Sequence, residues 1–74
     1  MTTKYVIGLR DSYGIEYLTS SYSVWNSSPE LEHAYLFSLA KAKDLIKEAE
    51  ANGLSCILYE LRSVSEREIT QTIC

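Results

Sequence analysis

Residues 38–53 carry the signals of a complete amphipathic helix, including both of its ends. Five apolar residues recur at steps of three and four, which places them on one stripe: Leu39, Ala42, Leu45, Ile46 and Ala49. Ser38 is a suitable N-cap, because its hydroxyl can accept a hydrogen bond from a free amide of the first turn. Asn52 and Gly53 tolerate the left-handed turn that ends many helices. A helix of this length is marginal alone, so its apolar stripe predicts a packing partner elsewhere in the chain.

An earlier start of this helix is the alternative. Ser28 before Pro29 also forms a favourable N-cap and first-turn pair, which would give one continuous helix reaching the same C-terminal end. However, Ala34–Phe37 is a compact apolar run, and Phe37 would lie off the main stripe of such a helix. The sequence therefore favours a break near Ser38, with a short strand or an irregular segment before it.

The remainder of the chain predicts short β-strands. Residues 4–10 are rich in β-branched and aromatic residues, and residues 15–19 return after the turn at residues 11–14, which predicts a hairpin. Residues 54–64 predict a further strand, and residues 34–37 are a candidate edge strand. We therefore expect an α+β fold: an antiparallel sheet of three to four strands with the helix packed on one face.

The chain has 74 residues, which is enough for one small domain, and its hydrophobic content of 46% argues against disorder. We expect a single domain over residues 1–74. The segment 65–74 has two interpretations besides a frayed or accessory tail. Ser65 and Glu68 have the spacing of a capping box, whereas residues 68–73 have high β propensity.

Alternation along the strands predicts the two faces of the sheet. The expected helix side holds Tyr5, Ile7, Leu9, Ile15, Tyr17, Ile57, Tyr59 and Leu61. The expected opposite side has an apolar centre and charged margins: Val6, Leu18, Cys56 and Leu58 with Lys4, Arg10, Glu16, Glu60 and Arg62. An exposed apolar patch rimmed by charge often marks an interface. The alternative is that the tail, or the loop over residues 20–32, covers this side.

Three further aromatic residues have no place in this expected core. Tyr13 lies in the hairpin turn, and Tyr22 and Trp25 lie in the loop over residues 20–32. Exposed aromatic residues recur at binding hot spots, although a loop aromatic can also fold back on a small core, which is the preferred interpretation for Trp25. The candidate residues for a protein interface are Val6, Arg10, Tyr13, Leu18, Tyr22, Trp25, Leu58 and Arg62.

Charge and hydropathy exclude several function classes. The net charge of −3, without a basic patch, argues against direct binding of nucleic acid or of an anionic membrane. No apolar run approaches the ~20 residues of a membrane span, and the start of the chain lacks an export signal, so we expect a cytoplasmic protein. Cys56 and Cys74 are interpreted as two free cytosolic thiols in preference to a structural disulfide.

No catalytic, cofactor-binding or metal-binding motif is found in the sequence. His33 with Glu30 and Glu32 offers too few converging ligands for a metal site, and a solvated polar stretch explains these residues better. Cys56 and His33 could serve as nucleophile and base, but nothing in the sequence orients either one. The glycines form no phosphate loop, and the carboxylates show no acid and base pair. We therefore expect no enzymatic activity, no cofactor and no metal.

The order of elements resembles a class of small proteins that phages and other mobile elements of bacteria encode. The resemblance spans residues 4–64 and rests on four features: the strand with Tyr5-Val6-Ile7, the loop with Trp25, the segment Ala34-x-x-Phe37-Ser38 before the helix, and the final strand with Ile57-x-x-Glu60. Several small acidic phage proteins of this size inhibit bacterial defence systems, and anti-CRISPR proteins are among them. No functional residue can be carried over from them to this chain.

This resemblance implies a non-enzymatic inhibitor in the cytoplasm of a bacterial host. It would bind and sterically block a host defence protein, such as a CRISPR–Cas nuclease or effector. The alternative is a structural or regulatory homo-oligomer, for example a homodimer, whose subunits pair through the open sheet face or an edge strand. The two hypotheses differ in whether the chain associates with itself when no partner is present.

Overall fold

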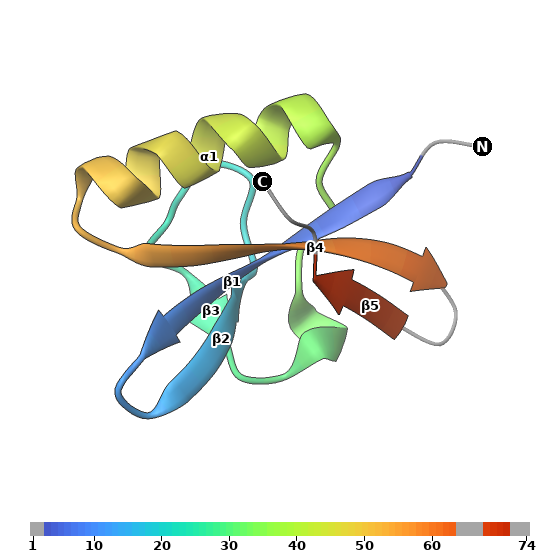
Figure 1. Ribbon diagram of the computed structural model, residues 1–74, viewed down its shortest axis with the longest axis horizontal. Helices are drawn as coiled ribbons and strands as arrows, with labels where there is room; N and C mark the ends of the chain where they lie inside the picture. Colours follow the sequence, from blue (N-terminus) through green and yellow to red (C-terminus); the bar gives the residue numbers. More distant parts are fainter. Residues whose placement is uncertain (1–2, 64–67, 72–74) are drawn as a thin grey trace.

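The structure, a computed structural model, describes residues 3–63 and 68–71. In chain order its elements are β1 (Lys4–Asp11), β2 (Gly14–Leu18), β3 (Ser27–Ser28), the 3-10 helix η1 (Leu31–His33), α1 (Leu39–Ala51), β4 (Ser55–Ser63) and β5 (Glu68–Gln71). The five strands form one antiparallel sheet in the order β3-β2-β1-β4-β5, and α1 lies along one side of it (Figure 1). The predicted α+β class is confirmed, with five strands rather than three to four.

The limits of α1 agree with the capping signals. The hydroxyl of Ser38 accepts a hydrogen bond from the backbone N–H of Lys41 at 3.3 Å. At the other end the side chain of Asn52 donates to the carbonyl oxygen of Glu48 at 2.8 Å, and Gly53 follows with φ +80°. The predicted break at Ser38 is therefore confirmed, because α1 begins directly after this residue.

The alternative of a continuous helix from Pro29 is wrong. Tyr5 and Phe37 exchange two backbone hydrogen bonds of 2.8 Å each, which hold Phe37 beside β1 as an isolated bridge. The backbone N–H of Tyr35 also donates to the carbonyl oxygen of Leu18 at 2.9 Å. The candidate edge strand at residues 34–37 therefore joins β1 by one bridge only. In a continuous helix these backbone groups would instead form hydrogen bonds within the helix.

The β1–β2 turn determines which residues of β2 share a face with β1. Asp11 pairs with Gly14 across a two-residue turn, and the Asp11 carboxylate accepts a hydrogen bond from the N–H of Tyr13 at 2.8 Å. In the resulting register Arg10 lies opposite Ile15, and Gly8 lies opposite Tyr17. Directly opposite residues share a face. Ile15 and Tyr17 therefore lie on the side of Gly8 and Arg10, away from Ile7.

The core lies between α1 and one face of the sheet. Its buried members are Ile7, Leu18, Val24, Phe37, Ala42, Leu45, Ala49 and Leu58, with Tyr5, Leu9, Ile46, Leu54 and Cys56 packed around them. In β4 the register places Leu58 opposite Ile7 and Ile57 opposite Gly8. The predicted faces of β2 and β4 were therefore wrong, although that of β1 was correct. A shift of one residue exchanges the faces of a strand. In β4 the buried Leu58 shares its face with the charged Glu60, so alternation alone favoured the other set of positions.

The loop between β2 and β3 covers part of the helix side. Val24 is 1% exposed and belongs to the core, and the N–H of Thr19 donates to the carbonyl oxygen of Asn26 at 3.0 Å, which closes the loop. Figure 1 shows this loop running close to α1. Tyr22 and Trp25 flank Val24 but remain 82% and 67% exposed. The preferred interpretation that Trp25 folds back on the core is therefore wrong, since Val24 takes that place.

Candidate functional site

The side of the sheet that faces away from α1 is here called the open face. The strand pairings place on it Lys4, Val6, Gly8, Arg10, Ile15, Tyr17, Ile57, Tyr59 and Leu61. Val6, Gly8 and Leu61 are buried on this side, whereas Ile15, Tyr17 and Ile57 are half-buried. No α-helix of the described residues packs on this side. Half-buried apolar side chains at a sheet surface are typical of a binding surface.

Two tyrosines form the centre of the open face. The rings of Tyr17 on β2 and Tyr59 on β4 make an edge contact, with centroids 6.1 Å apart and planes at 60°. They come from strands on either side of β1, so they meet across Gly8. A Cβ atom at Gly8 would come within 2.8 Å of Cε2 of Tyr59 and 3.0 Å of Cγ2 of Ile15. Because Gly8 has no side chain, Tyr59 and Ile15 can pack directly against the backbone of β1.

Cations mark the two ends of the open face. Lys4 and Arg10 lie on the same side of β1 and are six residues apart, which is roughly 20 Å along an extended strand. Burial and the neighbouring Tyr17 raise the pKa of Tyr59, while Arg10 opposes that rise. The carboxylates of β2 and β4, Glu16 and Glu60, lie on the opposite side. Among the strand side chains that the structure describes, the open face thus carries positive charge only.

The eight predicted interface residues do not form one surface in the structure. Arg10 lies on the open face and Val6 lies buried beneath it. Leu18 and Leu58 are 0% and 4% exposed and face α1, so their assignment to an open face was wrong. The other four are exposed elsewhere: Tyr13 in the turn, Tyr22 and Trp25 on the loop beside α1, and Arg62 near the end of β4.

Sequence reasoning missed the residues that carry most of the open face. Tyr17, Ile57 and Tyr59 were assigned to the core. The two-residue turn between Asp11 and Gly14 was the available signal for β2, because such a turn pairs odd-numbered with even-numbered positions. It would have placed Tyr17 opposite Gly8.

A groove opens on the other side of β4, beside α1. Its volume is about 300 Å³, and it is lined by Lys43, Ile46, Lys47, Glu50, Cys56 and Leu58. Burial, with a smaller contribution from Glu50, raises the pKa of the Cys56 thiol. The groove therefore combines an apolar floor, a protonated thiol at neutral pH and charged side chains from one surface of α1.

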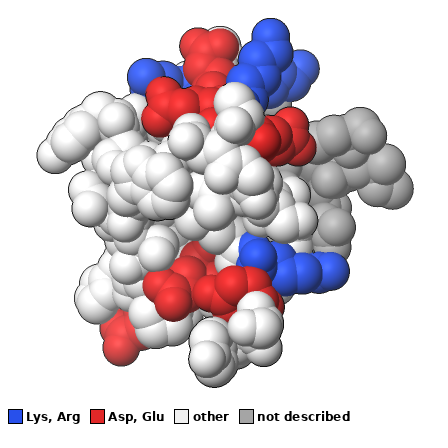
Figure 2. All heavy atoms as spheres, turned by 90° about the vertical axis from the view of Figure 1, so that its left-hand side faces the viewer, with Lys and Arg blue, Asp and Glu red and all other residues white. Residues whose placement is uncertain are grey.

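The end of the molecule that carries the β1–β2 turn shows two groups of charged side chains (Figure 2). Figure 2 shows charged side chains of both signs at the top, over α1, and a second group lower down toward the hairpin. Uncharged surface separates these two groups. The charges of α1 therefore belong to the helix side of the domain and lie apart from those of the hairpin.

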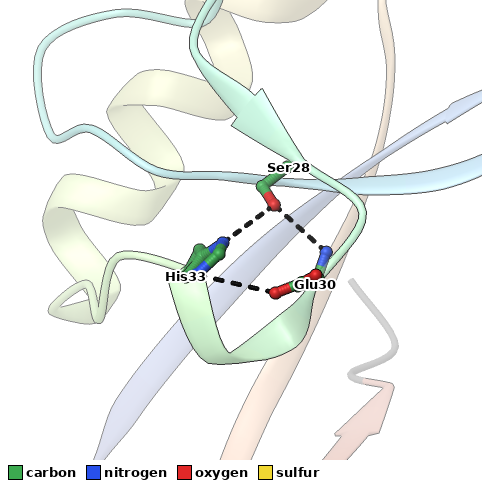
Figure 3. A network of polar contacts seen from close by, with 3 residues as sticks. All are labelled: Ser28, Glu30 and His33. Carbon is green, nitrogen blue, oxygen red and sulfur yellow. Dashed lines mark hydrogen bonds and ion pairs between the residues drawn. The ribbon is translucent and has the colours of Figure 1, made fainter.

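A polar network joins β3 to η1 (Figure 3). The Ser28 hydroxyl accepts a hydrogen bond from the N–H of Glu30 at 3.2 Å and contacts Nδ1 of His33 at 3.2 Å. Nε2 of His33 lies 3.5 Å from the carboxylate of Glu30, and both side chains are at least 60% exposed. All three groups come from six consecutive residues, so the network closes this turn on itself. Glu32, the third potential metal ligand of this stretch, is not part of the network.

In the part of the chain that the structure describes, no three His, Cys, Asp or Glu side chains gather as a metal site. No helix among these residues is long and apolar enough to cross a membrane. Comparisons of the chain with protein-family models, with curated proteins and with solved structures found no match.

Proposed function

We propose that this chain is a non-enzymatic protein-binding domain that acts by covering a surface of its partner. The observation that carries the proposal is the open face, where two tyrosines and an arginine surround apolar side chains. Tyrosine and arginine are among the residues most enriched at binding hot spots. Tyr17 and Tyr59 already contact each other, so little side-chain entropy is lost when a partner packs on them.

The charge of the open face indicates the chemistry of the partner. Lys4 and Arg10 are the cations at its two ends, although the chain as a whole has a net charge of −3. A partner surface with an apolar centre and carboxylates about 20 Å apart would complement both ends. We therefore infer an acidic protein surface as the occupant, and we expect its association rate to fall as the salt concentration rises.

The resemblance to small phage and mobile-element proteins supports a host defence protein, such as a CRISPR–Cas effector, as this partner. A homodimer through the open face is the competing arrangement. In a twofold dimer each copy presents the same patch, so Lys4 and Arg10 of both copies would enter one interface. Like charges brought together in this way oppose association, which favours the acidic partner.

The experiment starts from tagged protein used to capture partners from bacterial lysate, with light scattering to measure the mass of the free protein. The captured protein is then purified, and its affinity is measured for variants of the open face. Arg10→Glu and Ile57→Asp should each weaken binding at least tenfold, because one reverses a rim charge and the other places a carboxylate among the tyrosines. Circular dichroism checks that each variant is folded.

Two matched controls lie on the helix side of the domain. Tyr22→Ser removes an exposed tyrosine from the loop, and Lys41→Glu reverses an exposed charge on α1. Both should bind like the unmodified protein. If Arg10→Glu binds normally while Tyr22→Ser does not, the interface is the loop rather than the open face. A free protein that is already a dimer, and that Ile57→Asp converts to a monomer, would support the homodimer instead.

A further inference from the structure

Two exposed aromatic side chains lie on the loop between β2 and β3. Tyr22 is 82% exposed and Trp25 is 67% exposed. The loop runs beside α1 (Figure 1), so it belongs to the helix side of the domain and contributes no residue to the open face. Large aromatic side chains supply much of the contact area in protein interfaces. A partner on the open face would leave these two rings uncovered.

The loop is anchored by its own contacts. Val24, between the two aromatic residues, is 1% exposed and packs in the core. The hydroxyl of Ser20 accepts a hydrogen bond from the N–H of Tyr22 at 3.2 Å, and that of Ser23 accepts one from the N–H of Trp25 at 3.1 Å. The backbone of both aromatic residues is thus held in place. A ligand that packs on their rings therefore orders little of the loop.

The loop carries no charge. Residues 17–29 contain no Asp, Glu, Lys, Arg or His, although 23% of the chain is charged. A charged ligand therefore gains no electrostatic attraction from the loop itself, which favours an uncharged one. The loop differs in this respect from the open face, where Lys4 and Arg10 mark the two ends.

The polar side chains around the two rings are available as hydrogen-bond donors. The indole N–H of Trp25 can only donate, and neither it nor the Tyr22 hydroxyl forms a hydrogen bond within the described residues. The Ser23 oxygen already accepts the N–H of Trp25, which leaves its hydroxyl hydrogen free to donate. A matching ligand offers apolar surface and carbonyl acceptors. It should have few N–H groups of its own, because these would lose their hydration without gaining a partner.

We propose that this loop binds a proline-rich segment of a partner protein through the rings of Tyr22 and Trp25. Proline has no backbone N–H, and a polyproline II helix leaves its carbonyl oxygens free because it forms no internal hydrogen bonds. One turn of this helix is about 9 Å long. Tyr22 and Trp25 are three positions apart, so their Cα atoms are at most about 11 Å apart. The two rings can therefore contact one turn or two successive turns.

A second copy of this chain does not provide such a segment, because Pro29 is its only proline. The occupant is therefore a different protein. Since the loop and the open face lie on opposite sides of the sheet, the chain could hold a proline-rich segment and an acidic partner at the same time.

The test titrates the full chain with decaproline, an uncharged peptide that forms this helix without a partner. Trp25 is the only tryptophan of the chain, so its fluorescence reports on the loop directly. We expect a saturable fluorescence change and an affinity that differs less than about twofold between low and high salt. A glycine-serine peptide of the same length is the matched ligand and should give no saturable change.

Three results of this titration would overturn the proposal. One is the absence of a saturable change with decaproline. Another is an equal response to the glycine-serine peptide, which would show that the loop does not recognise the polyproline helix. The third is a saturable change with a glucose oligosaccharide but not with decaproline, which would make the loop a glycan-binding surface.

Variants separate the loop from other exposed aromatic residues. Tyr22→Ser should weaken decaproline binding about tenfold. Trp25→Phe, measured by calorimetry, keeps a ring but lacks the indole donor and should weaken it roughly threefold. Tyr13→Ser is the matched control, because Tyr13 is 97% exposed in the hairpin turn, and it should bind like the unmodified chain. Equal losses in Tyr13→Ser and Tyr22→Ser would overturn the proposal, because they would indicate non-specific contact with any exposed tyrosine.

Ile57→Asp distinguishes this proposal from the function proposed for the open face. It should bind decaproline like the unmodified chain, even where it no longer binds the acidic partner. Loss of decaproline binding in Ile57→Asp, with normal binding in Tyr22→Ser, would place the peptide on the open face and overturn the loop site. Circular dichroism checks that every variant is folded.

Discussion

The ring of Tyr59 lies over Gly8, so closely that a Cβ atom on Gly8 would approach Cε2 of Tyr59 to 2.8 Å. Gly8 is in the middle of β1, where a glycine without another role weakens a strand. Here the glycine permits a large ring on β4 to pack against β1 and against Tyr17 of β2. This contact shapes the centre of the open face.

Gly8→Ala should therefore destabilise the domain, although alanine is the better strand residue. The added methyl group meets the Tyr59 ring and Ile15, and overpacking of this kind costs about 1–2 kcal/mol of unfolding free energy. Urea denaturation measures the effect. In a Tyr59→Ala background the same substitution should cost less than half as much. An equal cost in both backgrounds would mean that the Tyr59 contact is not the cause.

Neighbouring residues of β4 should respond very differently to truncation. Leu58→Ala removes a core side chain that is 4% exposed and should cost about 2–5 kcal/mol. Ile57→Ala removes a half-buried side chain from the open face and should cost about 1 kcal/mol. Chemical denaturation of both variants tests the assignment of faces directly. The reverse order of the two values would contradict the register between β1 and β4.

Because Leu58 is buried in the core, a substitution at this position tests folding rather than binding. If Leu58 lay on an exposed interface, as the sequence predicts, Leu58→Asp would abolish binding while leaving the domain folded. Because Leu58 packs among Ile7, Ala42 and Leu45 in the core, a carboxylate there should unfold the domain instead. Circular dichroism of Leu58→Asp at neutral pH checks this, with Ile57→Asp as the folded counterpart. A well-folded Leu58→Asp protein would show that this position is not in the core.

Stability should fall at alkaline pH through Tyr59. Burial and Tyr17 raise the pKa of Tyr59, so the folded state holds this proton at a pH where the unfolded state has released it. The associated stability is complete below the ordinary tyrosine pKa of about 10. It is lost as the pH rises from there through the higher pKa of the folded state.

Unfolding free energies of Tyr59→Phe measured between pH about 9 and about 11 test this linkage. The variant should lose less stability over this range than the unmodified protein. Tyr13→Phe is the matched control, because Tyr13 is 97% exposed, and it should follow the unmodified protein. An unchanged decline in Tyr59→Phe would assign the alkaline sensitivity to another group.

Removal of the N-cap should destabilise α1. In Ser38→Ala the N–H of Lys41 loses its side-chain acceptor, which typically costs about 1 kcal/mol. Thermal and urea denaturation give this value. Ser12→Ala, in the exposed hairpin turn, is the control and should change the unfolding free energy by less than about 0.5 kcal/mol. Similar losses in the two variants would mean that the Ser38 cap contributes little.

The sequence by itself determined the elements whose signals are local. Ser38, Asn52 and Gly53 set the limits of α1, because a helix end is a matter of a few neighbouring hydrogen bonds. The β1–β2 hairpin was likewise evident from its turn. The pairing of Asp11 with Gly14 also determines which side chains of β2 share a face with those of β1. The strand propensity of residues 68–71 was also visible, although a capping-box interpretation competed with it.

Only the tertiary structure decided the segment before α1 and the faces of β4. Phe37 is held by two hydrogen bonds to Tyr5, a partner far away in the sequence, and no local pattern reports such a bond. In β4 the set Ile57, Tyr59 and Leu61 is wholly apolar, whereas Leu58 shares its face with the charged Glu60, so alternation favours the wrong face. The physical reason lies in packing: Gly8 offers room for the ring of Tyr59 on the face away from α1, while Leu58 packs in the core opposite Ile7.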